Sequence, residues 1–231
     1  MRADGYNNVM RGPFSPLHLL VFVLLLVCLP LFVQLGLVSL AFDKLGLSMS
    51  QGMLLLFTSL FGSALNMPIT TIKAERPEQD STQPDLRRLL RLSPLPFTGS
   101  TLIAINVGGC LVPIVFSASL ISRFPLAMQD MVLAIAITTA ICYAASRPVP
   151  GIGIGMPIFI APITAAIVAM MIGGELAPPL AYICGTLGVL IGADLLRMKD
   201  VARLGAPIAS IGGAGTFDGI FLTGIVAVLL T

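Results

Sequence analysis

The sequence has little charge, no tryptophan and a single histidine. Only 10% of its 231 residues are charged, whereas 56% are hydrophobic and the mean hydropathy is +0.99. A soluble domain carries about 25% charged residues, so this chain has too little polar surface to face water on all sides. The shortage of charge indicates a membrane protein, and a net charge of +2 gives no indication of a nucleic-acid partner.

The residues of the common metal and nucleophile sites are also missing. No C-x-x-C pair exists, and His18 is remote from any candidate nucleophile. The sequence therefore predicts no metal and no cofactor. The cysteines are interpreted as small apolar residues inside apolar segments, namely Cys28, Cys110, Cys142 and Cys184.

Long uncharged segments are what the chain has instead. A helix that crosses a bilayer needs roughly 20 apolar residues. The sequence predicts an all-α fold, with a single integral membrane domain over residues 1–231 and a cytoplasmic loop over residues 73–96. Seven spans are expected, at Leu19–Leu40 (an uncleaved signal anchor), Gly46–Ile72, Thr98–Ile121, Met128–Ala145, Pro157–Gly174, Leu180–Leu196 and Ile208–Leu230.

The distribution of positive charge predicts the orientation of these spans. Eleven of the thirteen Lys and Arg residues fall on the side of the N-terminus, and only Lys44 and Arg123 fall on the other. Cytoplasmic loops carry the excess of Lys and Arg. We therefore expect a cytoplasmic N-terminus and a C-terminus outside, with the lipid bilayer as the main partner.

Two acidic residues lie inside predicted spans, Asp194 in the sixth and Asp218 in the seventh. The helix rise places them roughly 21 Å and roughly 18 Å from the outer face. The two spans are sequential and antiparallel, so both carboxyl groups are expected at similar depth. Two adjacent carboxyl groups share one proton and can act as acid and base on a peptide bond. The sequence thus predicts a catalytic pair of Asp194 and Asp218.

Polar and flexible residues near this pair are candidates for binding a substrate. A glycine-rich run precedes Asp218, and a break there would expose the N–H groups of a half-helix. Such a backbone could hold a membrane-embedded peptide in an extended form. The predicted substrate-binding residues are Gly212, Gly213, Gly215, Thr216 and, from the third span, Asn106.

Other interpretations of the same residues stay open. Asp194 could pair with Arg197 one turn later, and Asp218 could cap a shorter helix. A protonatable pair beside broken helices would also suit a proton- or ion-coupled transporter of a small solute. The third alternative is a non-catalytic membrane scaffold, in which the aspartates only satisfy broken backbone.

Two long segments carry a resemblance to a known family. Ala181-Tyr-Ile-Cys-Gly-Thr-Leu-Gly-Val-Leu-Ile-Gly-Ala-Asp194 and Ala209-Ser-Ile-Gly-Gly-Ala-Gly-Thr-Phe-Asp218-Gly resemble an uncharacterised bacterial and archaeal multi-pass membrane family, the domain of unknown function 1614. The resemblance extends to Ile105–Gly109 and Pro148–Gly151. It implies a location in a bacterial or archaeal plasma or inner membrane, and no particular activity.

A weaker resemblance is to the presenilin and signal-peptide-peptidase class of intramembrane aspartyl proteases. That class has one catalytic Asp in its sixth span and another in a Gly-x-Gly-Asp motif of its seventh. Asp194 and Asp218 lie in the corresponding spans, which implies peptide hydrolysis. The sequence departs from the class at Phe217, where the second glycine belongs, and at Ala193, where a Tyr is usual; no Pro-Ala-Leu segment follows Asp218.

Overall fold

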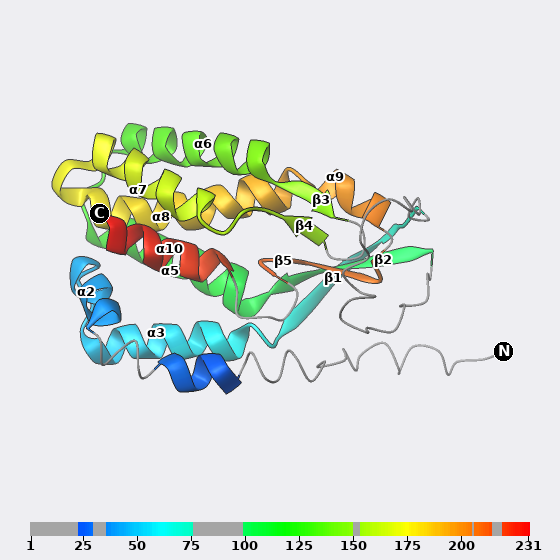
Figure 1. Ribbon diagram of the computed structural model, residues 1–231, viewed down its shortest axis with the longest axis horizontal. Helices are drawn as coiled ribbons and strands as arrows, with labels where there is room; N and C mark the ends of the chain where they lie inside the picture. The colour runs from blue at the N-terminus through cyan, green and yellow to red at the C-terminus, as the bar shows by residue number, and fades with distance from the viewer. Residues whose placement is uncertain (1–22, 30–35, 76–98, 150–152, 205, 214–218) are drawn as a thin grey trace. The chain divides into compact units, whose positions relative to one another are not determined.

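The computed structural model describes residues 23–29, 36–75, 99–149, 153–204, 206–213 and 219–231 (Figure 1). The chain divides into two compact units, Met1–Leu37 and Val38–Thr231. In the first unit, residues 23–29 are helical. Residues 19–22 and 30–35 of the predicted first span lie outside the described residues, so its role as a signal anchor stays a prediction.

The second unit is built mainly from helices, and α8 is the central one. The helices are α2 (Leu37–Lys44), α3 (Met49–Gly62), α5 (Val112–Arg123), α6 (Met128–Ala145), α7 (Ile160–Gly173), α8 (Ala177–Val189), α9 (Met198–Val201) and α10 (Gly219–Leu230). Two π-helical segments, η1 (Val107–Leu111) and η3 (Leu190–Leu195), and two 3-10 turns, η2 (Gly174–Leu176) and η4 (Ala202–Leu204), adjoin them. Helix α8 packs against α5, α6, α7 and α10 (Figure 1). Nearly all of its residues are buried, as expected of a helix that is apolar on every side.

Small residues allow the helices around α8 to approach closely. A Cβ atom on Gly188 of α8 would lie 2.7 Å from Thr138 Cγ2 on α6, and one on Gly224 of α10 would lie 2.8 Å from the Tyr182 ring. Small residues at interfaces are typical of helix packing in lipid, where the hydrophobic effect does not drive helices together. The hydroxyl groups of Ser117 and Thr186, 3.0 Å apart, link α5 to α8.

In the described part of the chain, five short strands form two small sheets at one end of the helices (Figure 1). The larger sheet has the order β1 (Asn66–Lys73), β2 (Ser100–Asn106) and β5 (Ile208–Ile211). Strands β1 and β2 are antiparallel, with Asn66 opposite Asn106, and β2 and β5 are parallel. Strands β3 (Arg147–Val149) and β4 (Gly153–Gly155) form an antiparallel pair.

These strands correct the predicted second, third and seventh spans. The mostly helical class is confirmed, but the residues at one end of each of these three spans are extended. In β1, Pro68 cannot donate a helical hydrogen bond, and Thr70, Thr71 and Ile72 are branched at Cβ, which favours a strand. The strand pairs satisfy the backbone groups that a continuous helix would otherwise have paired internally.

The number of helices that can cross a membrane is smaller than predicted. Among the described residues, two apolar helical stretches are long enough, Met128–Ala145 and Ile160–Leu195. A third is possible if α2 and α3, bent by 104°, form one span. The second stretch folds back at Gly174, whose φ is 53°. As a result, Cys184 Sγ of α8 lies 3.7 Å from the carbonyl oxygen of Ala165 in α7. Seven separate spans and the predicted orientation are therefore not supported by the helices themselves.

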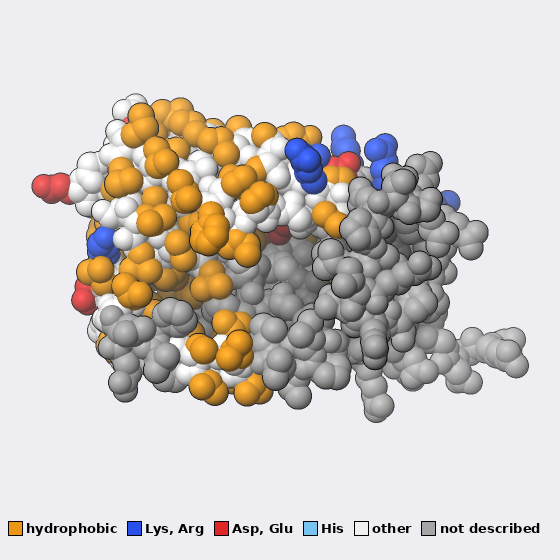
Figure 2. Space-filling model, viewed as in Figure 1, with side chains coloured by type: hydrophobic (Ala, Val, Ile, Leu, Met, Phe, Trp, Pro, Cys, Tyr) orange, Lys and Arg blue, Asp and Glu red, His pale blue; other side chains and the backbone are white. Residues whose placement is uncertain are grey.

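The outer faces of the helices are apolar. Large hydrophobic side chains on α6, α7 and α10 are exposed, including Leu133, Met171 and Leu222. Figure 2 shows hydrophobic side chains spread over the described helical surface, with several Lys and Arg side chains gathered toward the upper right. Exposed apolar area of this extent marks a surface that meets lipid or another apolar partner. The chain therefore has the character of a membrane-associated protein.

Candidate functional site

Asp194 lies in η3, at the end of the central helix. Here the backbone changes from α-helical to π-helical bonding, and the N–H of Leu196 reaches back to the carbonyl oxygen of Ile191 at 2.9 Å. Such π-helical turns occur frequently at functional sites. The Asp194 side chain is partly buried, and its Oδ2 accepts a hydrogen bond from the Gly212 N–H at 2.7 Å. This short contact joins the end of α8 to the end of β5.

Gly212 can take this position only because it has no side chain. Its φ is 85°, which residues with a Cβ atom rarely adopt. A Cβ atom here would also lie 2.7 Å from the backbone N of Cys110 in η1. Gly213 follows with a φ of 98°. Gly212 and Gly213, the first two glycines of the predicted run, thus form a tight backbone turn after β5. In space, this turn contacts η1 on one side and Asp194 of η3 on the other.

Asn106 caps the start of η1, the first turn of the helix that continues as α5. Its side chain is fully buried. The Oδ1 atom accepts from the Gly109 N–H at 2.8 Å, while Nδ2 donates to the Ser63 carbonyl at 2.7 Å and to Asn66 Oδ1 at 3.1 Å. The Ser210 hydroxyl of β5 donates to the same Asn66 oxygen at 2.6 Å. All the polar atoms of Asn106 are thus occupied by the protein, and its predicted role in binding substrate stays a prediction.

The predicted residues Asp194, Gly212 and Asn106 belong to one connected region. Asn106 holds the N–H of Gly109, the backbone of η1 at Gly109 and Cys110 contacts Gly212, and Gly212 donates to Asp194. The predicted Gly215, Thr216 and Asp218 lie outside the described residues. We define this region, formed by η1, η3 and the end of β5, as the break site.

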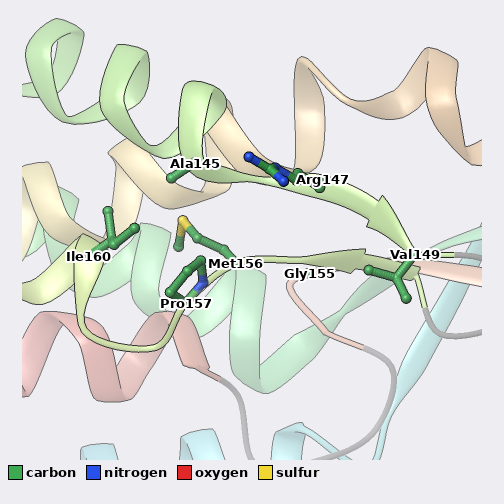
Figure 3. Close-up of a pocket in the computed structure, with 7 residues that line it drawn as sticks. All are labelled: Ala145, Arg147, Val149, Gly155, Met156, Pro157 and Ile160. Carbon is green, nitrogen blue, oxygen red and sulfur yellow. The ribbon is translucent and has the colours of Figure 1, made fainter. Parts of the chain in front are cut away.

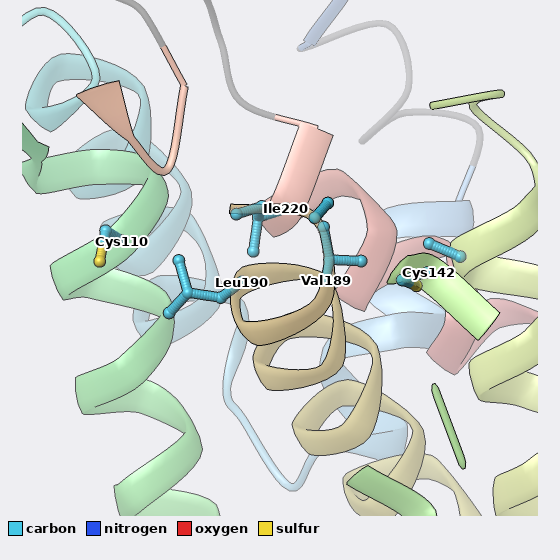
Figure 4. Packing of buried hydrophobic residues seen from close by; sticks show 7 residues of the cluster. Cys110, Cys142, Val189, Leu190 and Ile220 are labelled. Atoms are coloured by element: carbon cyan, nitrogen blue, oxygen red, sulfur yellow. The ribbon is translucent and has the colours of Figure 1, made fainter. Parts of the chain in front are cut away.

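The segments on either side of residues 214–218 both return to the break site. Gly212 lies before them, and Ile220, the second residue of α10, lies after them. Ile220 is 4% exposed and belongs to an apolar cluster with Leu190 and Ala193 of the α8–η3 segment (Figure 4). Ala193 precedes Asp194 directly. Ile220 of α10 and Ala193 of η3 therefore belong to one cluster.

Arg197 does not pair with Asp194, which corrects one of the alternatives. Its guanidinium group donates to the carbonyl oxygens of Tyr143 and Ser146, both at 2.8 Å, and to Asp200 at 3.2 Å. It also lies 4.1 Å from the centre of the Tyr143 ring. Arg197 therefore caps the last carbonyl groups of α6, where a cation is favoured. Among the described residues, Gly212 provides the hydrogen bond to the Asp194 carboxyl group.

Residues 60–230 match the model of a family described as protein of unknown function (DUF1614). The chain belongs to this family. The match covers α3 from Leu60, both sheets and the break site. No curated protein and no solved structure matches the chain. The resemblance to the presenilin class thus remains an expectation from the sequence.

Sequence reasoning missed two features near the break site. The first is Ser210, which completes the polar network of Asn66 and Asn106; its place between Ala209 and Ile211 in an apolar run gave no signal. The second is an open groove of about 540 Å³ beside the β3–β4 hairpin (Figure 3). The groove is lined by Ala145, Arg147, Val149, Gly155, Met156, Pro157 and Ile160. Among the described residues, no group of three His, Cys, Asp or Glu side chains could hold a metal ion.

Proposed function

We propose that the chain is an integral membrane protein whose strand end faces the cytoplasm. The helices α3, α5, α6, α7, α8 and α10 each run between the strand end and the opposite end of the second unit. Among the described residues, five of the seven Lys and Arg lie at the strand end, namely Lys73, Arg147, Arg197, Lys199 and Arg203. The positive-inside rule then assigns this end to the cytoplasm and the end of α10 to the outside.

In this arrangement the strands complete crossings for which the helices alone are too short. Helix α10 has 12 residues, which span about 18 Å. The four residues of β5 add about 13 Å, so the two elements together approach the 30 Å of a hydrocarbon core. The crossings of α3 with β1, of β2 with α5 and of β5 with α10 are of this kind. With α6, α7, α8 and the predicted span Leu19–Leu40, they make up the seven-span topology that we propose.

The proposed activity is hydrolysis of peptide bonds in membrane-embedded segments by Asp194 and Asp218. One carboxylate accepts a proton from water, and the water oxygen attacks the peptide carbonyl carbon. The other carboxyl group, protonated, donates its proton to the carbonyl oxygen. The first carboxyl group then gives the proton that it took from water to the leaving nitrogen. As the C–N bond breaks, one hydroxyl proton of the tetrahedral intermediate returns to the second carboxylate. The single observation that carries this proposal is the Gly212–Asp194 hydrogen bond, because it joins a carboxyl group to a strand at the edge of a sheet.

That edge supports a peptide as the substrate. Among the described strands, β5 pairs with β2 alone and lies at the edge of the sheet. In the pairing with β2, the Leu102 N–H donates to the Pro207 carbonyl oxygen at 2.9 Å. Backbone N–H and C=O groups of successive residues point to opposite sides of a strand. The N–H and C=O of Ile208 therefore point away from β2. An extended peptide could pair with this edge and be held beside Asp194, a common mode of peptide recognition.

The test is cleavage of a model transmembrane peptide by the purified protein in lipid nanodiscs. Asp194→Asn and Asp218→Asn are each expected to lower the cleavage rate by about 10²- to 10⁴-fold, since each removes a general acid or base. Asp130→Asn, at the opposite end of the bundle on α6, is the matched control and should leave the rate unchanged. Cleavage that persists in both Asp194→Asn and Asp218→Asn would rule out this mechanism.

A second candidate is a proton- or ion-coupled carrier of a small solute. The observation that favours it is the contact between two helix ends. The first turn of the α5 helix, η1, and the last turns of the α8 helix, η3, both contact Gly212. Transporters often place their binding sites where helix ends meet inside the membrane. A proton gradient that drives solute uptake into liposomes, abolished by Asp194→Asn, would favour this function over hydrolysis. The scaffold interpretation instead predicts that neither measurement gives a signal.

A further inference from the structure

The groove beside the β3–β4 hairpin combines an apolar lining with a single cation. Met156, Pro157 and Ile160 supply apolar surface, and Ala145 closes one end at the last turn of α6 (Figure 3). Pro157 and the two residues after it, Ile158 and Phe159, are exposed. Such an apolar surface at the ends of membrane-type helices meets acyl chains rather than water.

Arg147 is the charged residue of this groove, and its charge is not neutralised by a described residue. It is exposed, and no described carboxylate forms a salt bridge with it. Asp200, the acidic residue of the neighbouring segment, pairs with Arg197 instead. Arg197 in turn holds Ser146, the residue before Arg147, and thereby fixes the end of α6. A guanidinium group beside an apolar groove is complementary to an anionic group that carries a hydrocarbon chain.

We propose that this groove binds an anionic phospholipid, with the phosphate group at Arg147 and one acyl chain along Met156, Pro157 and Ile160. Arg147 lies two residues after Ala145, the end of a helix long and apolar enough to cross the bilayer. In the membrane placement proposed above, this is the depth at which lipid phosphate groups lie. The proposal is independent of the aspartates and of any catalytic activity.

The absence of tryptophan from the chain provides a specific probe. Ile160→Trp places one fluorophore in the groove, and Met171→Trp places one on an exposed part of α7 outside it. Quenching by brominated phosphatidylglycerol and by brominated phosphatidylcholine then gives the relative affinity of each site. We expect about a fivefold preference for phosphatidylglycerol at position 160, the size of one lysine or arginine contact at an anionic surface, and no preference at position 171.

Substitutions of Arg147 test which residue supplies the preference. Arg147→Gln should abolish it, Arg147→Lys should retain most of it, and Arg203→Gln, an exposed arginine of the strand end outside the groove, should leave it unchanged. Phe159→Trp is the alternative reporter if Ile160→Trp does not fold. Equal preference at positions 160 and 171, or an equal loss with Arg147→Gln and Arg203→Gln, would overturn the proposal. Loss of the preference on adding inorganic phosphate would instead assign the site to free phosphate.

Discussion

The break site contains two π-helical segments that carry different polar side chains. One, η1, follows Asn106 and begins the helix that continues as α5; the other, η3, contains Asp194 and ends the helix of α8. At η1 the polar side chain is a neutral amide, fully buried, with three hydrogen bonds to the protein. At η3 it is a carboxyl group, only partly buried, with one hydrogen bond to a described residue. The side chain of Asn106 at η1 is thus fully hydrogen-bonded within the protein. Among the described residues, the Asp194 carboxyl group at η3 has one donor and keeps acceptor capacity for a ligand.

The comparison predicts that exchanging amide and carboxyl groups has very different effects on stability at the two positions. Asn106→Asp has the larger effect. It replaces an N–H₂ donor by an oxygen that faces the Ser63 carbonyl at 2.7 Å, and it buries an uncompensated charge. We expect the free energy of unfolding to fall by about 4 kcal/mol, measured by thermal and denaturant unfolding in detergent.

Asn66→Asp is the control for that exchange. Asn66 is exposed, and the atom that accepts from Asn106 and Ser210 is its oxygen, which an aspartate retains. Its effect should be below about 1 kcal/mol. An Asn106→Asp protein as stable as the Asn66→Asp protein would show that the buried hydrogen bonds of Asn106 do not stabilise the start of η1.

The next largest effect on stability is expected at Gly212, in the turn that contacts both η1 and η3. Gly212→Ala places a Cβ atom 2.7 Å from backbone atoms of η1 and forces a residue with a Cβ atom to a φ of 85°. We expect a loss of about 3 kcal/mol of stability, seen as a lower unfolding temperature. Gly219→Ala is the matched control, because a Cβ atom there meets nothing within 4 Å, and it should be neutral or slightly stabilising in a helix.

The smallest expected effect on stability is that of Asp194→Asn. The amide keeps an oxygen that can accept from the Gly212 N–H, so the free energy of unfolding should change by less than about 1 kcal/mol. A stability close to that of the wild type, together with loss of activity, would separate function from folding at this residue. A large drop in stability would instead indicate that Asp194 is a structural residue like Asn106.

The sequence predicted the helices that lie wholly within apolar segments. Helix α6 has the bounds that the sequence predicts, Met128–Ala145. The predicted fifth span corresponds to α7, and the predicted sixth span to α8 together with η3. The strands were not predicted, because a short apolar run such as Ile208–Ile211 has no periodicity that separates strand from buried helix. The pairing of β2 with β5 joins residues about a hundred positions apart. No local pattern in a single sequence indicates which distant segments pair.

The candidate site was predictable in its residue types and not in its contacts. Asp194 stood out because a carboxyl group in an apolar segment is costly, and Gly212 because glycines cluster there. The partner of Arg197 could not be deduced, since Asp194 and Asp200 are both three residues away along the chain. In the structure Arg197 pairs with Asp200, because Asp194 faces the end of β5 and accepts from the Gly212 N–H there.

The parallel pairing of β2 with β5 also has a consequence for folding on the ribosome. Synthesis runs from the N-terminus, so β2 and η3 are made before Ile208 and Gly212 are added. A nascent chain therefore carries Asp194 without its N–H partner until 18 more residues have been joined to it. A chain that stops before Gly212 cannot form the break site.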